Sequence, residues 1–192
     1  MPSREEKKAA TRRRLLSAAA AVVAKQGAMA ASLDAIAERA GLTKGAVYSN
    51  FDSKEDLLFE MAGTYAGPSV HVEPRDGDTL AAYLERLGAE TAKANRTTPG
   101  RMWRLGTEMY YFALRNARFR RLYAANDRQN RAMTAEVFDR ITAASGERPS
   151  MTGEELYTVV NALAVGLSEA RLIDPDAVPD DLFPKAFRLL AS

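Results

Sequence analysis

A short polar segment, GLTKGAVYSNFDSKEDLL, spans residues 41–58 and gathers hydroxyl, amide and ammonium side chains around a glycine. Such groups donate hydrogen bonds to phosphate oxygens, and a lysine also reaches the edge of a guanine. A glycine removes the side chain that would keep the backbone away from such a partner. The segment contains no His or Cys that could serve as a base or nucleophile. Its residue types therefore predict recognition of a polyanion rather than catalysis.

Two short helices are needed to hold this segment, and the first of them precedes it. Ser32 is placed to cap a helix over residues 33–40, because its hydroxyl accepts a bond from a free backbone N–H of the first turn. The apolar side chains of this helix fall on one face, formed by Leu33, Ile36, Ala37 and Ala40. Gly41 then ends the helix and allows a tight turn.

The second short helix carries the polar side chains. Thr43 is predicted to cap a helix over residues 44–50, with Val47 and Phe51 facing inward. Two short helices joined by a glycine-containing turn, packed on a longer first helix, describe a helix-turn-helix. The residues left facing outward are Lys44, Gly45, Tyr48 and Ser49. The N-terminal half of the second helix enters the DNA major groove in such motifs, so these residues are predicted to contact DNA.

A further helix follows at once. Ser53, with Asp56 three residues later, resembles a capping box at the start of this helix. Free backbone N–H groups at a helix start attract phosphate, and Lys54 stands beside them. We therefore expect Lys54 to contact the DNA backbone. The alternative is an ordinary solvated lysine, which is the common state of that side chain.

The rest of the chain is also predicted to be helical, so the expected fold class is all-α. About nine helices are expected, near residues 9–26, 33–40, 44–50, 54–66, 79–95, 99–115, 118–145, 152–173 and 180–190. No alternation of period two is long enough for a sheet. Segments rich in Pro, Gly and charge interrupt the helices at 67–78, 145–155 and 174–181. The chain therefore divides into a compact front unit and a larger helical bundle.

The distribution of charge agrees with a polyanion partner near the N-terminus. The 192 residues carry a formal net charge of +2, yet residues 1–25 hold seven Lys or Arg against two Asp or Glu. Residues 132–192 hold five basic and ten acidic side chains. Such asymmetry is typical of proteins that bind nucleic acid with one part of the chain. The chain has no cysteine, which agrees with a reducing cytoplasm.

The sequence contains few features that would indicate an enzyme, a metal site or a membrane protein. His71 is the only histidine, and no zinc, Walker or dinucleotide-binding pattern occurs, so no metal, cofactor or catalytic site is predicted. A pair of carboxylates is the one catalytic route left open. The apolar run from Leu15 to Ala24 resembles a secretory signal, but Glu5, Glu6 and the helical spacing of its apolar residues favour a core helix. The run is too short to span a bilayer, and no other stretch comes closer.

Residues 9–58 resemble the DNA-binding unit of the tetracycline-repressor (TetR-like) family of bacterial regulators. The pattern I-A-x-x-A-G-x-[ST]-x-G-x-x-Y-x-x-F-x-[SN]-K-x-x-L is far more specific than a bare helix-turn-helix. It is formed here by Ile36, Ala37, Ala40, Gly41, Thr43, Gly45, Tyr48, Phe51, Ser53, Lys54 and Leu57. C-terminal to this pattern, only the number, length and order of the helices agree with the family. The resemblance implies a DNA-binding domain over residues 1–52 and an effector-binding and dimerisation domain over residues 53–192.

The resemblance also implies a set of DNA-contacting residues. The set is Ser32, Thr43, Lys44, Gly45, Tyr48, Ser49, Asn50 and Lys54. Tyr48 and Lys54 are expected to hold phosphates, as is Thr43, whereas Lys44, Gly45 and Ser49 are expected to lie at base edges. The partner so implied is the double-stranded DNA of a palindromic operator, bound by a homodimer.

Some positions depart from the family pattern. Asn50 stands where His is frequent, although its amide can still donate to a phosphate. Ala31 stands where a hydroxyl residue is frequent, so one phosphate contact is expected to be absent. For Tyr48 the alternative is a half-buried core aromatic, which is disfavoured because Val47 and Phe51 already fill the inner face.

Aromatic residues between positions 101 and 123 are candidates for a ligand pocket. Aromatics at helical spacing usually pack in a core, yet Tyr and Trp add polar groups and Met adapts its shape. The family resemblance implies a pocket in the rear bundle for a small apolar or amphipathic effector. Its candidate residues are Trp103, Thr107, Tyr110, Tyr111 and Asn161.

The segment EELYTVVNALAVGLSEARLID carries a stripe of small residues that would let a second helix come close. The candidate dimer interface consists of Val159, Ala162, Leu163, Gly166, Leu167 and Ala170. In the family, the last two long helices of each subunit form a four-helix interface. Close packing within one subunit is the alternative. A dimer suits the function better, because two recognition helices that read adjacent major grooves must lie about 34 Å apart.

Three classes of function compete. The first is a ligand-responsive, dimeric, cytoplasmic transcriptional regulator, and repression is the usual outcome in the family. The second is a DNA-binding regulator of the same fold without a small-molecule effector. The third is a helical enzyme, for which no residue pattern argues.

Overall fold

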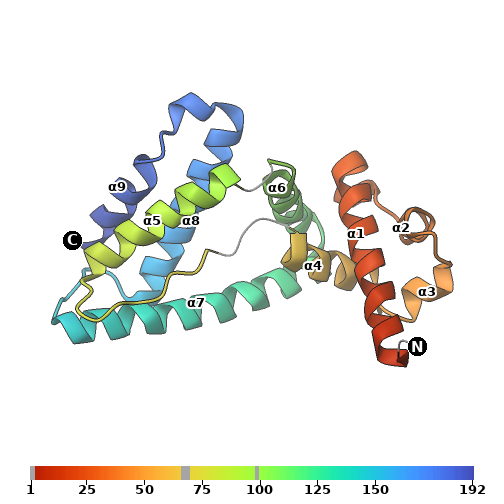
Figure 1. The fold of residues 1–192 in the computed structure, drawn as a ribbon, viewed down its shortest axis with the longest axis horizontal. Helices are drawn as coiled ribbons and strands as arrows, with labels where there is room; N and C mark the ends of the chain where they lie inside the picture. Colours follow the sequence, from red (N-terminus) through yellow and green to blue (C-terminus); the bar gives the residue numbers. More distant parts are fainter. Residues whose placement is uncertain (1–2, 66–69, 98–99) are drawn as a thin grey trace. The chain divides into compact units, whose positions relative to one another are not determined.

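The computed structural model describes residues 3–65, 70–97 and 100–192, and all regular elements in these ranges are helices (Figure 1). The α-helices are α1 (Arg4–Ala30), α2 (Leu33–Ala40), α3 (Lys44–Tyr48), α4 (Lys54–Tyr65), α5 (Leu80–Thr97), α6 (Gly100–Arg115), α7 (Ala117–Ser145), α8 (Gly153–Ile173) and α9 (Leu182–Arg188). The 3₁₀ turns η1 (Pro175–Ala177) and η2 (Leu189–Ala191) follow α8 and α9. The predicted all-α fold is confirmed.

The largest difference from the predicted boundaries is at the N-terminus. α1 begins at Arg4 because Ser3 and Glu6 form a capping box, in which Ser3 Oγ accepts from Glu6 N at 3.1 Å and Ser3 N donates to Glu6 Oε2 at 2.6 Å. Gly27 has a φ of 80° and interrupts the helix just after its predicted end at residue 26, although one more turn follows it. Residues 66 and 99, which were predicted to be helical, lie outside the described residues.

The first compact unit comprises Met1–Gly67 and Gly100–Ala124, in which α1 packs against α2, α4 and α6. Its core includes Leu15, Ala19, Ile36, Val47, Leu57, Leu58, Met61, Met109, Phe112 and Phe119. Burying one such large side chain stabilises the fold by about 1.5–3 kcal/mol. The helix-turn-helix therefore rests on a continuous core to which α4 and α6 contribute.

The second compact unit comprises Pro68–Pro99 and Ala125–Ser192. Its core is formed by Leu80, Tyr83, Leu84, Phe138, Ile141, Leu156, Val160 and Phe187. α5 and α9 pack so closely that a Cβ on Gly88 would lie 2.6 Å from Pro184 Cα, and only glycine fits there. Glu147 Oε2 accepts from Leu80 N at 2.7 Å and satisfies a free backbone N–H at the start of α5.

These packing units do not follow the predicted domain boundary at residue 52. α4 and α6 bury Leu57, Leu58 and Met109 in the same core as α1. Packing thus assigns α4, α6 and the start of α7 to the body that carries the helix-turn-helix. The division into functions at residues 1–52 and 53–192 stays a prediction.

Candidate nucleic-acid interface

The turn between α2 and α3 is held by two capped helix starts. Ser32 Oγ accepts from Ala35 N at 3.1 Å, and Thr43 Oγ1 accepts from Ala46 N at 3.3 Å. Between the two helices Gly41 has a φ of 62°, in the left-handed region that favours glycine. These three predicted roles are confirmed. Because each capping hydroxyl uses its oxygen as the acceptor, its proton remains free to donate to a phosphate.

α3 turns one face to the core and the other to solvent. Val47 is fully buried and Phe51 is 3% exposed, whereas Tyr48 is 55% exposed. Tyr48 is therefore not a core aromatic. Lys44, Gly45 and Ser49 are exposed beside it, so the predicted recognition residues share one solvent face.

Lys44 and Gly45 open the recognition helix α3. Lys44 Nζ pairs with Asp34 Oδ1 on α2 at 2.8 Å, and this hydrogen-bonded pair raises the pKa of Lys44. The pair is exposed, so a phosphate or base edge can replace it at small cost. Among the described residues, a Cβ on Gly45 would meet only Thr43 Oγ1, at 3.8 Å. The fold itself therefore does not require glycine at this position.

Ser49 and Asn50 direct part of their polar groups back into α3. Ser49 Oγ donates to Ala46 O at 3.0 Å, and Asn50 Nδ2 donates to Ala46 O at 2.7 Å. Asn50 Oδ1 is buried and has no hydrogen-bond partner among the described residues. Asn50 thus closes the end of α3 in this state, and a phosphate contact would require its amide to turn outward.

Lys54 begins α4, and its side chain reaches α1 and α6. Its Nζ donates to Met29 O at 3.2 Å and lies 5.5 Å from the centroid of the Phe112 ring. The ring face attracts a cation at this distance. Burial lowers the pKa of Lys54, while Glu55 opposes that shift. The predicted phosphate ligand is therefore already held by protein groups when DNA is absent.

The α6–α7 corner, residues 112–118, also holds the next two residues of α4. Asn116 Nδ2 donates to Glu55 Oε1 at 2.8 Å, and Arg118 Nη2 pairs with Asp56 Oδ2 at 2.8 Å. Residues 54–56 are thus contacted in succession by this one corner. The family motif contains no residue of the corner, so sequence reasoning missed these contacts.

α6 also contacts the end of α1. Glu108 Oε1 accepts a bond from Ala28 N at 2.8 Å, just after the break at Gly27. The bond satisfies a backbone N–H that the break would otherwise leave free. It also holds the turn whose Met29 carbonyl accepts the bond from Lys54.

Two arginines fix α1 to the helix-turn-helix. Arg12 Nε donates to Glu60 Oε1 at 2.7 Å, and its terminal nitrogens bond Glu60 Oε2 and Asn50 O. The hydrogen-bonded Glu60 raises the pKa of Arg12. Arg14 Nη2 donates to Ala40 O at 2.7 Å. α1 therefore passes the ends of α2 and α3 at these two residues.

The predicted effector residues are divided between the two units. Trp103, Thr107, Tyr110 and Tyr111 lie on α6, and Asn161 lies exposed on α8. Trp103 Nε1 is buried without a hydrogen-bond partner among the described residues. Tyr110 and Tyr111 are 49% and 55% exposed. These positions leave the predicted pocket untested.

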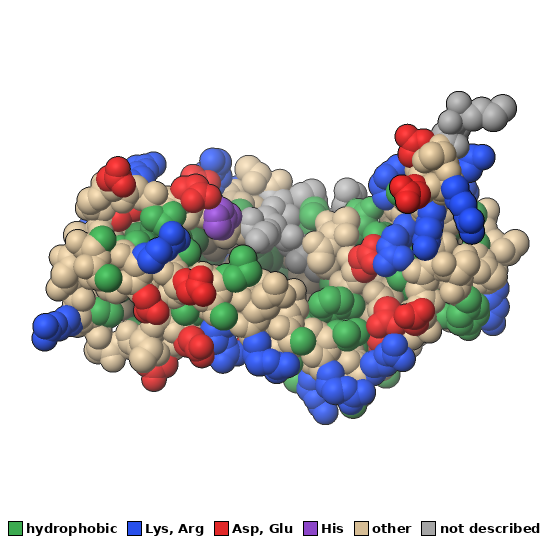
Figure 2. Space-filling model, turned by 90° about the horizontal axis from the view of Figure 1, so that it is seen from below, with side chains coloured by type: hydrophobic (Ala, Val, Ile, Leu, Met, Phe, Trp, Pro, Cys, Tyr) green, Lys and Arg blue, Asp and Glu red, His purple; other side chains and the backbone are tan. Residues whose placement is uncertain are grey.

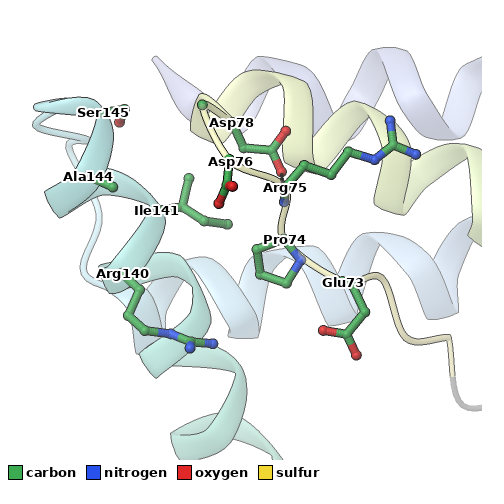
Figure 3. A pocket seen from close by; sticks show the side chains of 10 residues that line it. Glu73, Pro74, Arg75, Asp76, Asp78, Arg140, Ile141, Ala144 and Ser145 are labelled. Carbon is green, nitrogen blue, oxygen red and sulfur yellow. Dashed lines mark hydrogen bonds between the residues drawn. The ribbon is translucent and has the colours of Figure 1, made fainter.

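An open cleft of about 420 Å³ lies in the second unit, between the loop before α5 and the end of α7 (Figure 3). Its lining is Glu73, Pro74, Arg75, Asp76, Gly77, Asp78, Arg140, Ile141, Ala144 and Ser145. None of the predicted effector residues belongs to it. Charged side chains dominate its rim, unlike the mostly apolar pockets that bind drug-like molecules.

The predicted interface residues of α8 divide by exposure. Ala162, Gly166 and Ala170 are exposed, and a Cβ on Gly166 would meet no atom within 4 Å in the part of the chain that the structure describes. Leu163 and Leu167 instead pack against the cores of their own unit. The expectation that no stretch comes closer to a membrane span than Leu15–Ala24 was wrong. Within the described residues, α8 is the one helix long and apolar enough to cross a membrane by length and composition, and 17% of its apolar window is buried.

The fold and this interface define an all-α DNA-binding protein, whose helix-turn-helix presents polar and cationic side chains over a buried support. Residues 15–61 match the family of bacterial regulatory proteins called the tetR family. The matched residues therefore form a DNA-binding domain of the tetR type, and the chain is a transcriptional regulator, not an enzyme.

Solved structures with similar folds cover nearly the whole chain. NalD of Pseudomonas aeruginosa, the secondary repressor of the MexAB-OprM multidrug efflux pump, is 25% identical over 97% of this chain and 96% of its own, with a TM-score of 0.70. Salmonella enterica GusR is 21% identical over 94% and 93%, with a TM-score of 0.71. A putative regulator from Saccharomonospora viridis, solved in complex with choline, is 20% identical over 93% and 94%, with a TM-score of 0.63. A comparison with curated proteins found no match.

Proposed function

We propose that this protein is a dimeric, ligand-responsive repressor of the bacterial cytoplasm that binds a palindromic operator through α3. The observation that carries the proposal is the exposure of Lys44, Gly45, Tyr48 and Ser49 on one face of α3, above buried Val47 and Phe51. Such a face presents donors to base edges and phosphates while its backbone comes close to the duplex. The repressor NalD, similar along nearly the whole chain, supports the direction of regulation.

Dimerisation is supported by the exposed face of α8. Val165 is 46% exposed and Ile173 is 88% exposed, on either side of the small residues Gly166 and Ala170. Another face of α8 is packed in the second unit through Leu156 and Val160, so the helix is already partly covered by its own chain. A second copy of α8 would cover the remainder, and a two-fold axis would pair the same residues.

The effector is proposed to act through the α6–α7 corner. A movement of α6 changes the surroundings of Lys54, Glu55 and Asp56 together, because one corner contacts all three. It also acts on Ala28 through Glu108. Coupling of 1–3 kcal/mol, or about 5–150-fold in operator affinity, is typical for such switches. The choline complex of a protein with this fold supports a small-molecule ligand.

The proposal is tested by selecting bound fragments from the source genome at moderate ionic strength and footprinting them. We expect two protected half-sites related by a two-fold axis. Retention of no fragment, even at low ionic strength, would refute the function. Choline and a panel of lipophilic cations would then be added to the bound complex. Release by none of them would favour the second candidate, a regulator of the same fold without an effector.

The proposed relay is tested separately with the double variant Asn116→Ala, Arg118→Ala. We expect the variant to bind the operator but to show a weakened response to any compound that releases the wild-type protein. Hydrogen exchange should quicken in the first turn of α4. An unchanged response together with unchanged exchange would exclude the corner as the relay.

A further inference from the structure

The first two turns of α1 project beyond the core of the first unit. Residues 3–9 are all exposed, and the first buried side chain of the helix is Leu15. An unpacked helix end frays readily, yet the capping box of Ser3 and Glu6 satisfies the first backbone groups here. We call the segment from Arg4 to Thr11 the N-terminal arm.

One face of the N-terminal arm is basic. Arg4, Lys7 and Lys8 are three and four residues apart and so share a face of the helix. None of these three side chains forms an ion pair within the described residues. The Glu6 carboxylate already accepts a hydrogen bond from Ser3 N in the capping box. Figure 2 shows Lys and Arg side chains gathered around the N-terminal end of the chain.

This basic face continues the side of α1 that packs in the core. Thr11, Leu15, Ala18 and Val22 follow Arg4 at the same spacing, and the last three are buried. The arm therefore extends its charges on the same side as α2–α4 rather than on the outer side of the unit. It carries no large apolar side chain on this face for a protein or lipid partner to bury.

The arm extends past the end of the recognition helix. Arg12 donates to Asn50 O, just after α3, and Arg14 donates to Ala40 O at the end of α2. At 1.5 Å per residue, Lys8 and Arg4 lie about 6 and 12 Å beyond Arg12 along the helix. Figure 1 shows the N-terminal end of α1 and α3 at the same end of the first unit.

We propose that the N-terminal arm is a second DNA contact, in which Arg4, Lys7 and Lys8 bind the backbone phosphates that flank each half-site. The proposal rests on the function proposed for α3. The major groove is about 12 Å wide and bordered by phosphates on both sides, so the reach of the arm matches the distance to the next line of phosphates. The contact reads no base and adds affinity that depends on salt.

The test compares wild-type protein with the triple variant Arg4→Ala, Lys7→Ala, Lys8→Ala by fluorescence anisotropy. The control is Arg128→Ala, Arg140→Ala, Arg148→Ala, which removes the same charge from exposed positions of the second unit. Alanine preserves the helix, and circular dichroism confirms the fold of each variant. Two duplexes are used: the selected operator with long flanks, and the same operator trimmed at the outer edges of its half-sites.

On the flanked duplex, the plot of log affinity against log salt should become shallower by about 2–3 for the arm variant. Its affinity should fall at least tenfold at moderate salt, while base preference stays unchanged. On the trimmed duplex, the arm variant and wild type should bind within about twofold of each other. The control should match wild type on both duplexes.

An unchanged salt dependence of the arm variant on the flanked duplex would overturn the inference, as would an equal loss of affinity on both duplexes. Either result leaves the function of α3 intact if wild-type protein binds its operator. If wild-type protein binds no duplex, the proposed function and the arm contact fall together.

Discussion

Two helices of this protein carry exposed faces that we propose bind a partner, but α3 exposes polar groups and α8 exposes apolar ones. On α3, Tyr48 and Lys44 are exposed above the buried Val47. On α8, Gly166 and Ile173 are exposed, whereas Leu156 is packed in the core of the second unit. The face of α3 suits a hydrated polyanion, whereas the face of α8 suits a dry contact with another helix. The two surfaces should therefore respond in opposite ways to the same kind of substitution.

The largest effect is expected from Gly166→Arg. The exposed position leaves room for the side chain within one chain, so the fold should be kept while a bulky charge blocks the proposed dimer contact. Loss of the second recognition helix should lower operator affinity by a factor of about 10² or more. Sedimentation measures the oligomeric state and anisotropy the affinity.

Gly63→Arg is the matched control, since a Cβ on Gly63 also meets no atom of the described residues within 4 Å. This variant should remain dimeric. If the Gly166→Arg protein remains dimeric, α8 does not form the dimer interface.

A smaller effect is expected from Gly45→Ala. The substitution should not reduce folding stability, but it should weaken operator binding. The added methyl group meets only Thr43 Oγ1 at 3.8 Å. It should leave the free energy of unfolding equal or raise it by up to about 1 kcal/mol, because alanine favours a helix. The free energy of operator binding should become less favourable by about 1–3 kcal/mol if the backbone of α3 lies against the DNA. Denaturation and anisotropy measure the two quantities, and unchanged affinity would exclude a close approach at this residue.

Removing single tyrosine hydroxyls should affect operator binding in the first unit and folding stability in the second. Tyr48→Phe should weaken operator binding by about 1 kcal/mol, through loss of one phosphate bond, and leave unfolding unchanged because Tyr48 is 55% exposed. Tyr83→Phe should leave operator binding unchanged and lower the free energy of unfolding. The reason is that Tyr83 Oη donates to Val72 O at 3.0 Å inside the second unit. Its expected cost is about 1 kcal/mol of unfolding free energy. A stability loss in Tyr48→Phe would contradict the assignment of its hydroxyl to DNA.

The smallest effect concerns the pH dependence of binding. Burial lowers the pKa of Lys54 in the free protein, whereas a phosphate neighbour favours the ammonium and raises it. DNA binding should therefore take up protons at alkaline pH, and affinity should fall as pH rises through the lowered pKa. Lys54→Arg should abolish this dependence, because arginine stays charged. Calorimetry in buffers of different ionisation heat measures the uptake, and its persistence in Lys54→Arg would assign it to another group.

The local motif was sufficient to predict the helix-turn-helix in detail. Ser32, Gly41 and Thr43 act within a few residues of themselves, so their capping and turn roles follow from type and spacing. The inward Val47 and outward Tyr48 follow from helical periodicity. Each of these roles is fixed by interactions within one helix or one turn.

Long-range contacts were not predictable in the same way. The bonds of Lys54 to Met29 and of Asn116 to Glu55 join residues 25 and 61 positions apart. The motif predicted that Lys54 would be a phosphate ligand, but not that α1 and α6 hold it in the free protein. The N-terminal arm was missed because a helix that buries nothing has no apolar period. Its start is specified only by the cap at Ser3.

Methylation interference on the selected operator tests most directly whether α3 reads the major groove. Guanine N7 lies in that groove and adenine N3 in the minor groove. Methyl groups on guanine N7 within both half-sites should prevent binding by wild-type protein. Interference confined to adenine N3, or none within the half-sites, would contradict the placement of α3.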